Sequence, residues 1–189
     1  IDGGKHWTRN SKGLWDTRVL ALWLHPDDPK GGHVFAGTHT GIYESKDFAE
    51  SWQLANETAN WGGVQWFKQA VVDGKDYIVA NANANLLTRP LDGTSPWQKA
   101  EQAEDAPGSY RGLSVVTTAG KSEVFTCANQ KGKPAGLFFG AIDSPTNVTW
   151  DGPLKQPNVT FEDWEVFNNT FSSTIYGITK MISPGCTRT

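Results

Sequence analysis

The sequence predicts an all-β protein made of four repeats, each folded as a sheet of four antiparallel strands. Tryptophans mark the period, since they stand at positions 7, 52, 97 and 150, with steps of 45, 45 and 53 residues. The step from Trp150 through the two termini to Trp7 is 46 residues, so the period closes on itself. The 189 residues include 20 Gly and 9 Trp, which suits a chain of short strands and tight turns. Repeats of ~40–50 residues with four short strands are typical of the blades of a β-propeller.

Each repeat divides into β-branched and aromatic segments separated by turn residues. We expect the innermost strands at 18–24, 64–72, 113–118 and 165–171, and the second strands at 33–37, 76–80, 123–127 and 174–178. Turn residues lie between them at 25–29, 73–75 and 119–121. The prediction is one domain, 1–189, with blades at 14–57, 58–104, 105–157, and 158–189 together with 1–10.

The two ends of the chain complement each other. Residues 2–10 would supply the outer strand of the last blade, whose other strands come from 165–189. A ring of blades has no free sheet edge only when its first and last blades join in this way. We therefore expect a closed four-bladed propeller, in preference to a piece of a larger ring.

The same phrase recurs at the ends and inside the chain. Thr189 followed by residues 1–7 reads T-I-D-G-G-K-H-W, and residues 41–52 align with the joined ends without a gap. These phrases resemble the Asp box of the sialidase-like (bacterial neuraminidase repeat) β-propeller family, and the chain resembles a secreted, lectin-like member. The resemblance implies that the box is structural and lies opposite the functional face. The residues it assigns to this structural role are Asp2, Trp7, Asp47, Trp52, Asp92, Trp97, Asp143 and Trp150.

The functional face of such a ring is formed by the loops that join blades and the loops between second and third strands. The blade-joining loops, 10–17, 56–63, 102–110 and 155–164, each contain an aromatic near their end, and the other loops carry amides and hydroxyls. Aromatic faces beside amides and carboxylates suit a sugar, because its CH face stacks and its hydroxyls form directed hydrogen bonds. The alternative is that these aromatics only pack between blades. The candidate ligand-binding residues are Trp15, Asp16, Trp61, Asn81, Tyr110, Asn129 and Trp164.

An enzyme is the less favoured class. A sialidase needs three arginines around a carboxylate, and only Arg18 and Arg111 fall off the outer strands. A glycoside hydrolase needs two facing carboxylates, and a pair is possible among the acidic residues near the functional face, although acidic loop residues are ordinarily just solvated. These residues are Asp16, Glu104, Asp105, Glu162, Asp163 and Glu165. No catalytic residue is assigned. No metal or cofactor is expected, because the four histidines lack ligand spacing.

The remaining features concern location and partners. A net charge of −3 without a basic block argues against nucleic acid, and no apolar run is long enough to span a membrane. Four N-x-S/T sequons favour a secreted glycoprotein. Cys127 and Cys186 form a disulfide in that setting or remain two buried thiols. The sequon asparagines are Asn56, Asn147, Asn158 and Asn168.

Taken together, these features favour a secreted module that binds carbohydrate or a glycoconjugate. The alternatives are a glycoside hydrolase of an Asp-box propeller family and a non-catalytic propeller that binds proteins.

Overall fold

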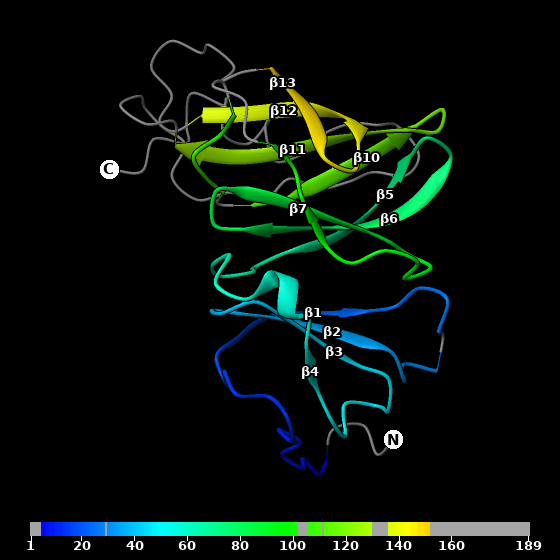
Figure 1. Cartoon of the computed structure of the whole chain (residues 1–189), viewed down its shortest axis with the longest axis vertical. Helices are drawn as coiled ribbons and strands as arrows, with labels where there is room; N and C mark the ends of the chain where they lie inside the picture. The colour runs from blue at the N-terminus through cyan, green and yellow to red at the C-terminus, as the bar shows by residue number, and fades with distance from the viewer. Residues whose placement is uncertain (1–4, 29, 102–105, 111, 130–135, 152–189) are drawn as a thin grey trace. The chain divides into compact units, whose positions relative to one another are not determined.

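The computed structural model of the chain describes residues 5–28, 30–101, 106–110, 112–129 and 136–151. In this part of the chain the fold is all-β, with strands β1 to β13, one turn of 3-10 helix, η1 (Asn56–Thr58), and no α-helix (Figure 1). No helix among these residues is long and apolar enough to cross a membrane. The chain divides into two compact units, Ile1–Gln65 and Trp66–Thr189, which are described separately.

The first unit contains one antiparallel sheet in the order β1-β2-β3-β4. Its strands are β1 (Val19–Leu24), β2 (Val34–Thr38), β3 (Ile42–Ser45) and β4 (Gln53–Leu54). The central strand β2 is buried along its whole length. Val34, Ala36, Tyr43 and Trp52 form the core cluster of this sheet. The 3-10 turn η1 follows β4 directly, which places its residues beside the start of β3.

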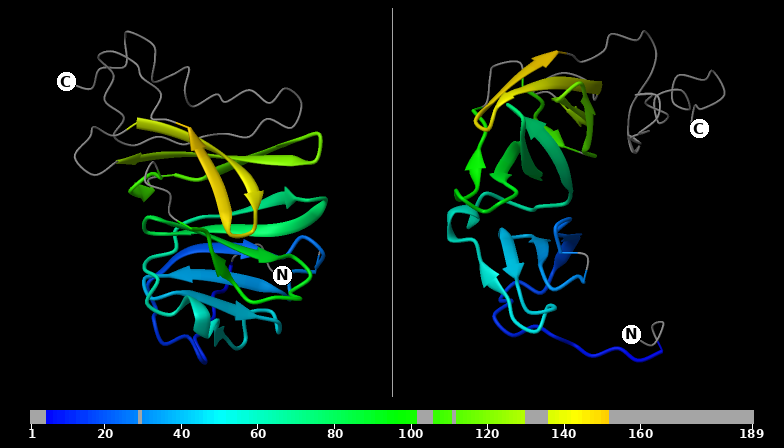
Figure 2. Two further views of the ribbon diagram at one scale, coloured as in Figure 1. Left: turned by 45° about the horizontal axis from the view of Figure 1, so that its top comes forward. Right: turned by 90° about the vertical axis from the view of Figure 1, so that its right-hand side faces the viewer.

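The second unit contains two further antiparallel sheets, which Figure 2 shows mainly in green and yellow. One has the order β5-β6-β7-β8, and the other has the order β10-β11-β12-β13 with β9 paired to β11. The strands of the first are β5 (Phe67–Val72), β6 (Lys75–Ala82), β7 (Asn85–Pro90) and β8 (Gln98–Lys99). Those of the second are β9 (Ser109–Tyr110), β10 (Ser114–Thr118), β11 (Lys121–Asn129), β12 (Gly136–Ser144) and β13 (Asn147–Asp151).

The two sheets of the second unit share one hydrophobic core. Its buried members come from both sheets and from the segments next to them: Ala70, Val72, Tyr77, Val79, Leu86, Ala100, Tyr110, Leu113, Val115, Val124, Ile142 and Val148. Polar bonds also cross between the sheets. The Val71 amide donates to Ser122 Oγ at 2.7 Å, and Thr88 Oγ1 donates to the Pro145 carbonyl at 2.5 Å. These sheets are therefore joined by apolar packing and by specific hydrogen bonds.

Two of the predicted turns have the expected backbone chemistry. In β5–β6, Asp73 and Gly74 have φ of 50° and 73°, and in β10–β11, Ala119 and Gly120 have φ of 50° and 77°. Two consecutive positive φ values are the signature of the two-residue turn whose twist matches a hairpin. The strongly twisted antiparallel pairs on either side therefore start from turns that the sequence indicates locally.

The prediction of an all-β chain with repeated antiparallel sheets of four strands is confirmed for the described residues. The structure describes three such sheets, and the predicted fourth blade, 158–189, lies outside the described residues. Residues 5–10, the described part of the predicted outer strand 2–10, form no strand. The predicted partner strands of 2–10, within 165–189, lie outside the described residues, so this pairing stays a prediction. The closed ring of four blades and its blade boundaries stay predictions.

Candidate functional site

The β3–β4 hairpin of the first unit is fixed by the carboxylate of Asp47. Its Oδ1 accepts hydrogen bonds from Ser45 Oγ at 2.8 Å and from the Ser51 amide at 2.9 Å, and its Oδ2 accepts from Ser51 Oγ at 2.5 Å. Bonds from the Ser51 side chain and amide and from Ser45 lower the pKa of Asp47 to about 2. Trp52 follows at once and is buried in the core. All the hydrogen bonds described for the Asp47 carboxylate come from residues of its own turn.

The other predicted boxes differ from one another. Asp92 accepts from the amide and hydroxyl of Thr94, at 2.9 and 2.7 Å, and Trp97 is buried. Asp143 instead accepts across its hairpin from Thr149 Oγ1 at 2.5 Å and from Asn147 Nδ2 at 3.3 Å. Trp7 is 89% exposed, and Asp2 lies outside the described residues.

The predicted functional loops of the first unit bring an aromatic and a carboxylate together. Trp15 is 89% exposed, whereas the side chain of its neighbour Asp16 is only 10% exposed. Asp16 Oδ1 accepts from the Arg18 amide at 3.0 Å and lies 3.6 Å from Arg18 Nε. Its Oδ2 is buried and has no hydrogen bond of good geometry within the described residues.

The ionised form of Asp16 is nevertheless favoured. Burial acts to raise the pKa of Asp16, but the hydrogen bonds from the Arg18 amide and the Thr40 side chain and the charge of Arg18 outweigh it and lower the pKa overall. A charged oxygen that is buried without a full set of donors carries a desolvation cost. Asp16 Oδ2 is enclosed by protein atoms, so a ligand reaches it only if the surrounding loop moves.

The loops around Asp16 are held by a chain of hydrogen bonds. Thr38 Oγ1 accepts from the Thr40 amide at 3.2 Å, and the Thr40 carbonyl accepts from the Asn60 amide at 3.1 Å. The Thr58 hydroxyl accepts from the Ile42 amide at 2.9 Å, which ties η1 to β3. These bonds fix the turn at 38–41 against the segment 58–61, which ends at the half-buried Trp61.

Gly41 is required for this close approach. Its φ is 153°, and a Cβ at this position would lie 2.9 Å from Thr58 Oγ1 and 3.0 Å from the Thr58 carbonyl oxygen. A side chain would therefore push the two loops apart.

Two predicted ligand-binding residues of the second unit are buried among protein groups. Asn81 is fully buried, and its Oδ1 accepts from the Trp66 amide at 2.9 Å. Tyr110 is buried with its ring edge-on to Trp150, at 6.0 Å between centroids, and burial raises the pKa of its hydroxyl. Asn129 pairs with Ser109 in the β11–β9 ladder, and Trp164 lies outside the described residues.

The predicted modification sites fall on different parts of the fold. Asn147 is exposed in the β12–β13 hairpin, and Asn56 begins η1. Cys127 is in β11. Asn158, Asn168 and Cys186 lie outside the described residues. Glycosylation and the disulfide stay predictions.

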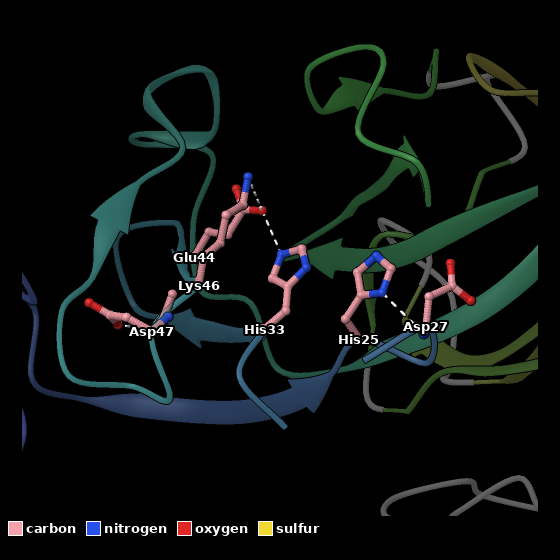
Figure 3. A network of polar contacts seen from close by, with 7 residues as sticks. His25, Asp27, His33, Glu44, Lys46 and Asp47 are labelled. Atoms are coloured by element: carbon pink, nitrogen blue, oxygen red, sulfur yellow. Dashed lines mark hydrogen bonds and ion pairs between the residues drawn. The ribbon is translucent and has the colours of Figure 1, made fainter. Parts of the chain in front are cut away.

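A polar cluster between β1, β2 and β3 has no counterpart among the predicted sites (Figure 3). The rings of His25 and His33 stack at 4.4 Å between centroids, and His33 Nε2 lies 2.7 Å from Glu44 Oε1. Leu24 pairs with Val34 in the β1–β2 ladder, so the next residue on each strand, 25 and 33, must also face each other. The hairpin register was the signal that could have identified this pair. In the described part of the chain, no three His, Cys, Asp or Glu residues are arranged to hold a metal ion.

Comparison with known proteins gives a fold and no family. No protein-family model matches the sequence, and no curated protein matches it. A solved structure that resembles it is that of an ancestral GH74 enzyme, a glycoside hydrolase with a β-propeller fold, at a TM-score of 0.55 and 15% identity. The likeness covers 78% of this chain and 20% of that enzyme. At this level of identity the likeness supports the all-β fold of antiparallel four-stranded sheets and no more.

Proposed function

We propose that this protein is a carbohydrate-binding module whose ligand site lies on the loops of its first unit, around Trp15, Asp16 and Trp61. One observation carries the proposal: an almost fully exposed indole, Trp15, is the chain neighbour of a carboxylate, Asp16, whose ionised form is favoured. The similarity in fold to a glycoside hydrolase makes a sugar ligand the natural chemical class to test first.

The two side chains supply complementary interactions. The Trp15 ring offers an apolar face on which the CH groups of a sugar ring can stack. Once the loop around it opens, the Asp16 carboxylate would be a charged acceptor, which forms stronger hydrogen bonds with hydroxyl donors than a neutral acceptor does. The Arg18 amide holds the Asp16 carboxylate, and hydrogen bonds order the neighbouring 38–41 and 58–61 segments, which lowers the entropy lost on binding.

The proposal includes the finer architecture and the location of the protein. In it, residues 158–189 form the fourth blade and 2–10 complete it, so that the ring closes. The protein is secreted and carries glycans on its sequons, and Cys127 pairs with Cys186. The intact mass of the protein secreted from a eukaryotic host tests both modifications, because each glycan adds mass and a disulfide removes two hydrogens.

A glycan array followed by calorimetric titration of the best ligand tests the binding function. Trp15→Ala is expected to weaken binding at least about tenfold, equal to about 1.4 kcal/mol. Trp7→Ala is the matched control, because Trp7 is equally exposed and lies outside the proposed site. Asp16→Asn keeps the shape of the side chain but removes the charge, and it should also weaken binding.

Each result separates the proposal from another function. No glycan binding at high protein concentration would overturn it and favour a protein-binding propeller. Equal losses of glycan affinity in the Trp15→Ala and Trp7→Ala variants would show that the binding site is not at Trp15.

The second candidate function is glycoside hydrolysis, which the GH74 neighbour favours. It requires a second carboxylate facing Asp16, and the sequence offers Glu162, Asp163 and Glu165. Release of reducing sugar from a bound polysaccharide, abolished in Asp16→Asn and in Asp163→Asn, would establish this function in place of simple binding.

A further inference from the structure

The His25–His33 pair occupies the end of the β1–β2 hairpin, away from the proposed sugar site on the 38–41 turn at the other end of β2. The two rings are nearly parallel, with 10° between their planes, and the His25 amide donates to the His33 carbonyl at 3.0 Å. Phe35 and Trp23 pack beside the rings. His25 is buried and His33 is partly buried, so a charge on either ring is poorly hydrated.

The His25 ring accepts a hydrogen bond from the loop that follows it. The Asp27 amide points at His25 Nδ1 at 3.2 Å (Figure 3). A backbone N–H is always a donor, so Nδ1 must be the unprotonated acceptor nitrogen of a neutral imidazole. A proton on Nδ1 would place two donors against each other and end this hydrogen bond.

Charged groups around the pair act in opposite directions. Glu44 contacts His33 and stabilises a charge on it, while Lys46, at 3.4 Å from Glu44, competes for the same carboxylate. Asp27 and Asp28 lie in the loop that follows His25, and Asp28 Oδ1 accepts from the Lys30 amide. Burial lowers the pKa of His33 more than its bond to Glu44 raises it, and a charge on His25 lowers it further.

The pair is mechanically connected to the Asp47 turn. The loop that follows His25 begins with a turn, in which the Asp28 amide donates to the His25 carbonyl at 3.1 Å. It then reaches Gly32, whose carbonyl accepts from the Phe48 amide at 3.0 Å. A Cβ on Gly32 would lie 3.3 Å from the Phe48 ring, so the ring packs closely over this glycine.

We propose that the His25–His33 pair is a pH-sensitive latch: with a neutral His33 ring it holds Gly32 against the Asp47 turn, and protonation of His33 in mild acid releases this contact. An imidazolium charge on His33 would lie in a 4.4 Å stack against the buried His25 ring, where it is poorly hydrated. The release is local, because the ladder between β1 and β2 does not include either histidine.

The direction of the pH effect follows from His33. Because its pKa is lower in the folded chain, the unfolded chain takes up the proton more readily. The stabilisation is complete above the ordinary value of 6.5 and is lost as the pH falls through the lower value of the folded chain.

Amide hydrogen exchange measured by NMR at about pH 7.5 and about pH 5 tests the latch. The protection factor of the Phe48 amide, corrected for intrinsic exchange, should fall at least about tenfold in acid. The Ala55 amide is the internal control, because it is bonded to the Ile42 carbonyl at the other end of the same sheet. Its protection should change less than about twofold.

Variants then assign the effect to the pair. His25→Asn keeps an acceptor for the Asp27 amide but removes the ring stacked on His33, so the acid-induced fall at Phe48 should disappear. His33→Gln retains a donor for Glu44 and provides the same test if His25→Asn does not fold. His39→Asn, which changes an exposed histidine in the 38–41 turn, should leave the fall intact. A wild-type protein with equal protection at both pH values, or a full fall in both His25→Asn and His33→Gln, would overturn the proposal.

Discussion

Thr58 provides a sharp test of how the loops of the first unit are held. Its side chain is fully buried, with Oγ1 accepting from the Ile42 amide at 2.9 Å and donating to the Ala55 carbonyl at 2.7 Å. Thr58→Val keeps the volume but removes the hydroxyl. The Ala55 carbonyl still accepts from the Thr58 amide at 2.8 Å, so only the Ile42 N–H loses its partner.

The expected cost follows from that single unpaired group. A buried amide left without an acceptor costs about 1–3 kcal/mol, so Thr58→Val should lower the free energy of unfolding by this amount. Thr58→Ser retains the hydroxyl and loses one methyl group, which should cost about 0.8 kcal/mol. The valine variant should therefore be less stable than the serine variant, although valine is closer to threonine in size.

Urea unfolding followed by tryptophan fluorescence measures the difference. Asn56→Gln controls for the sequon, because Thr58→Val also removes this possible glycosylation site while Thr58→Ser preserves it. Amide exchange at Asn60 should rise in Thr58→Val, since the 58–61 segment loses its tie to β3. A valine variant as stable as the wild type, within about 0.5 kcal/mol, would refute the assignment of Thr58 as the bond that joins η1 to β3.

Two other predictions concern the turn at Asp47 and the core of the second unit. Folding lowers the pKa of Asp47 from 3.8 to about 2, so its contribution to stability is present above about pH 4 and is lost as the pH falls through about 2. The acid unfolding of Asp47→Asn should lack this pH-dependent loss of stability. Asp73→Asn is the control, because it leaves the Asp47 turn intact. Ser122→Ala removes the acceptor of the Val71 amide and the partner of Thr117 Oγ1, so it should destabilise the second unit by about 1–3 kcal/mol in urea unfolding. Lys121→Ala changes the exposed neighbour and should alter the free energy of unfolding by less than about 0.5 kcal/mol. A Ser122 variant as stable as the Lys121 variant would show that this bond does not join the sheets.

Features set by neighbours in the sequence could be predicted well. The Asp73-Gly74 and Ala119-Gly120 turns were expected, and each has two consecutive positive φ values. The spacing of tryptophans predicted a repeating unit, and each of the three described sheets has its own meander of strands. Local backbone preference and the alternation of strand residues are enough for these predictions.

The candidate site could be predicted only in part. The sequence places Trp15 and Asp16 in one loop, but nothing in the local pattern indicates that the indole is exposed while the carboxylate is only 10% exposed. The sequence also predicts Asn81 as a loop amide, yet its side chain is fully buried and accepts from the Trp66 amide. Side-chain direction in a loop depends on contacts with distant residues, which a local pattern does not contain.

Short-range and long-range interactions therefore contribute different parts of this structure. The all-β class, the positions of the turns and the repeat of about 45 residues follow from short-range backbone preferences, so they can be predicted from the order of residues alone. That His25 faces His33, that Thr58 reaches Ile42 and that the Asp16 side chain is only 10% exposed is seen only in the folded chain. Each of these depends on the register of paired strands or the approach of two loops, and therefore on residues far apart in the chain.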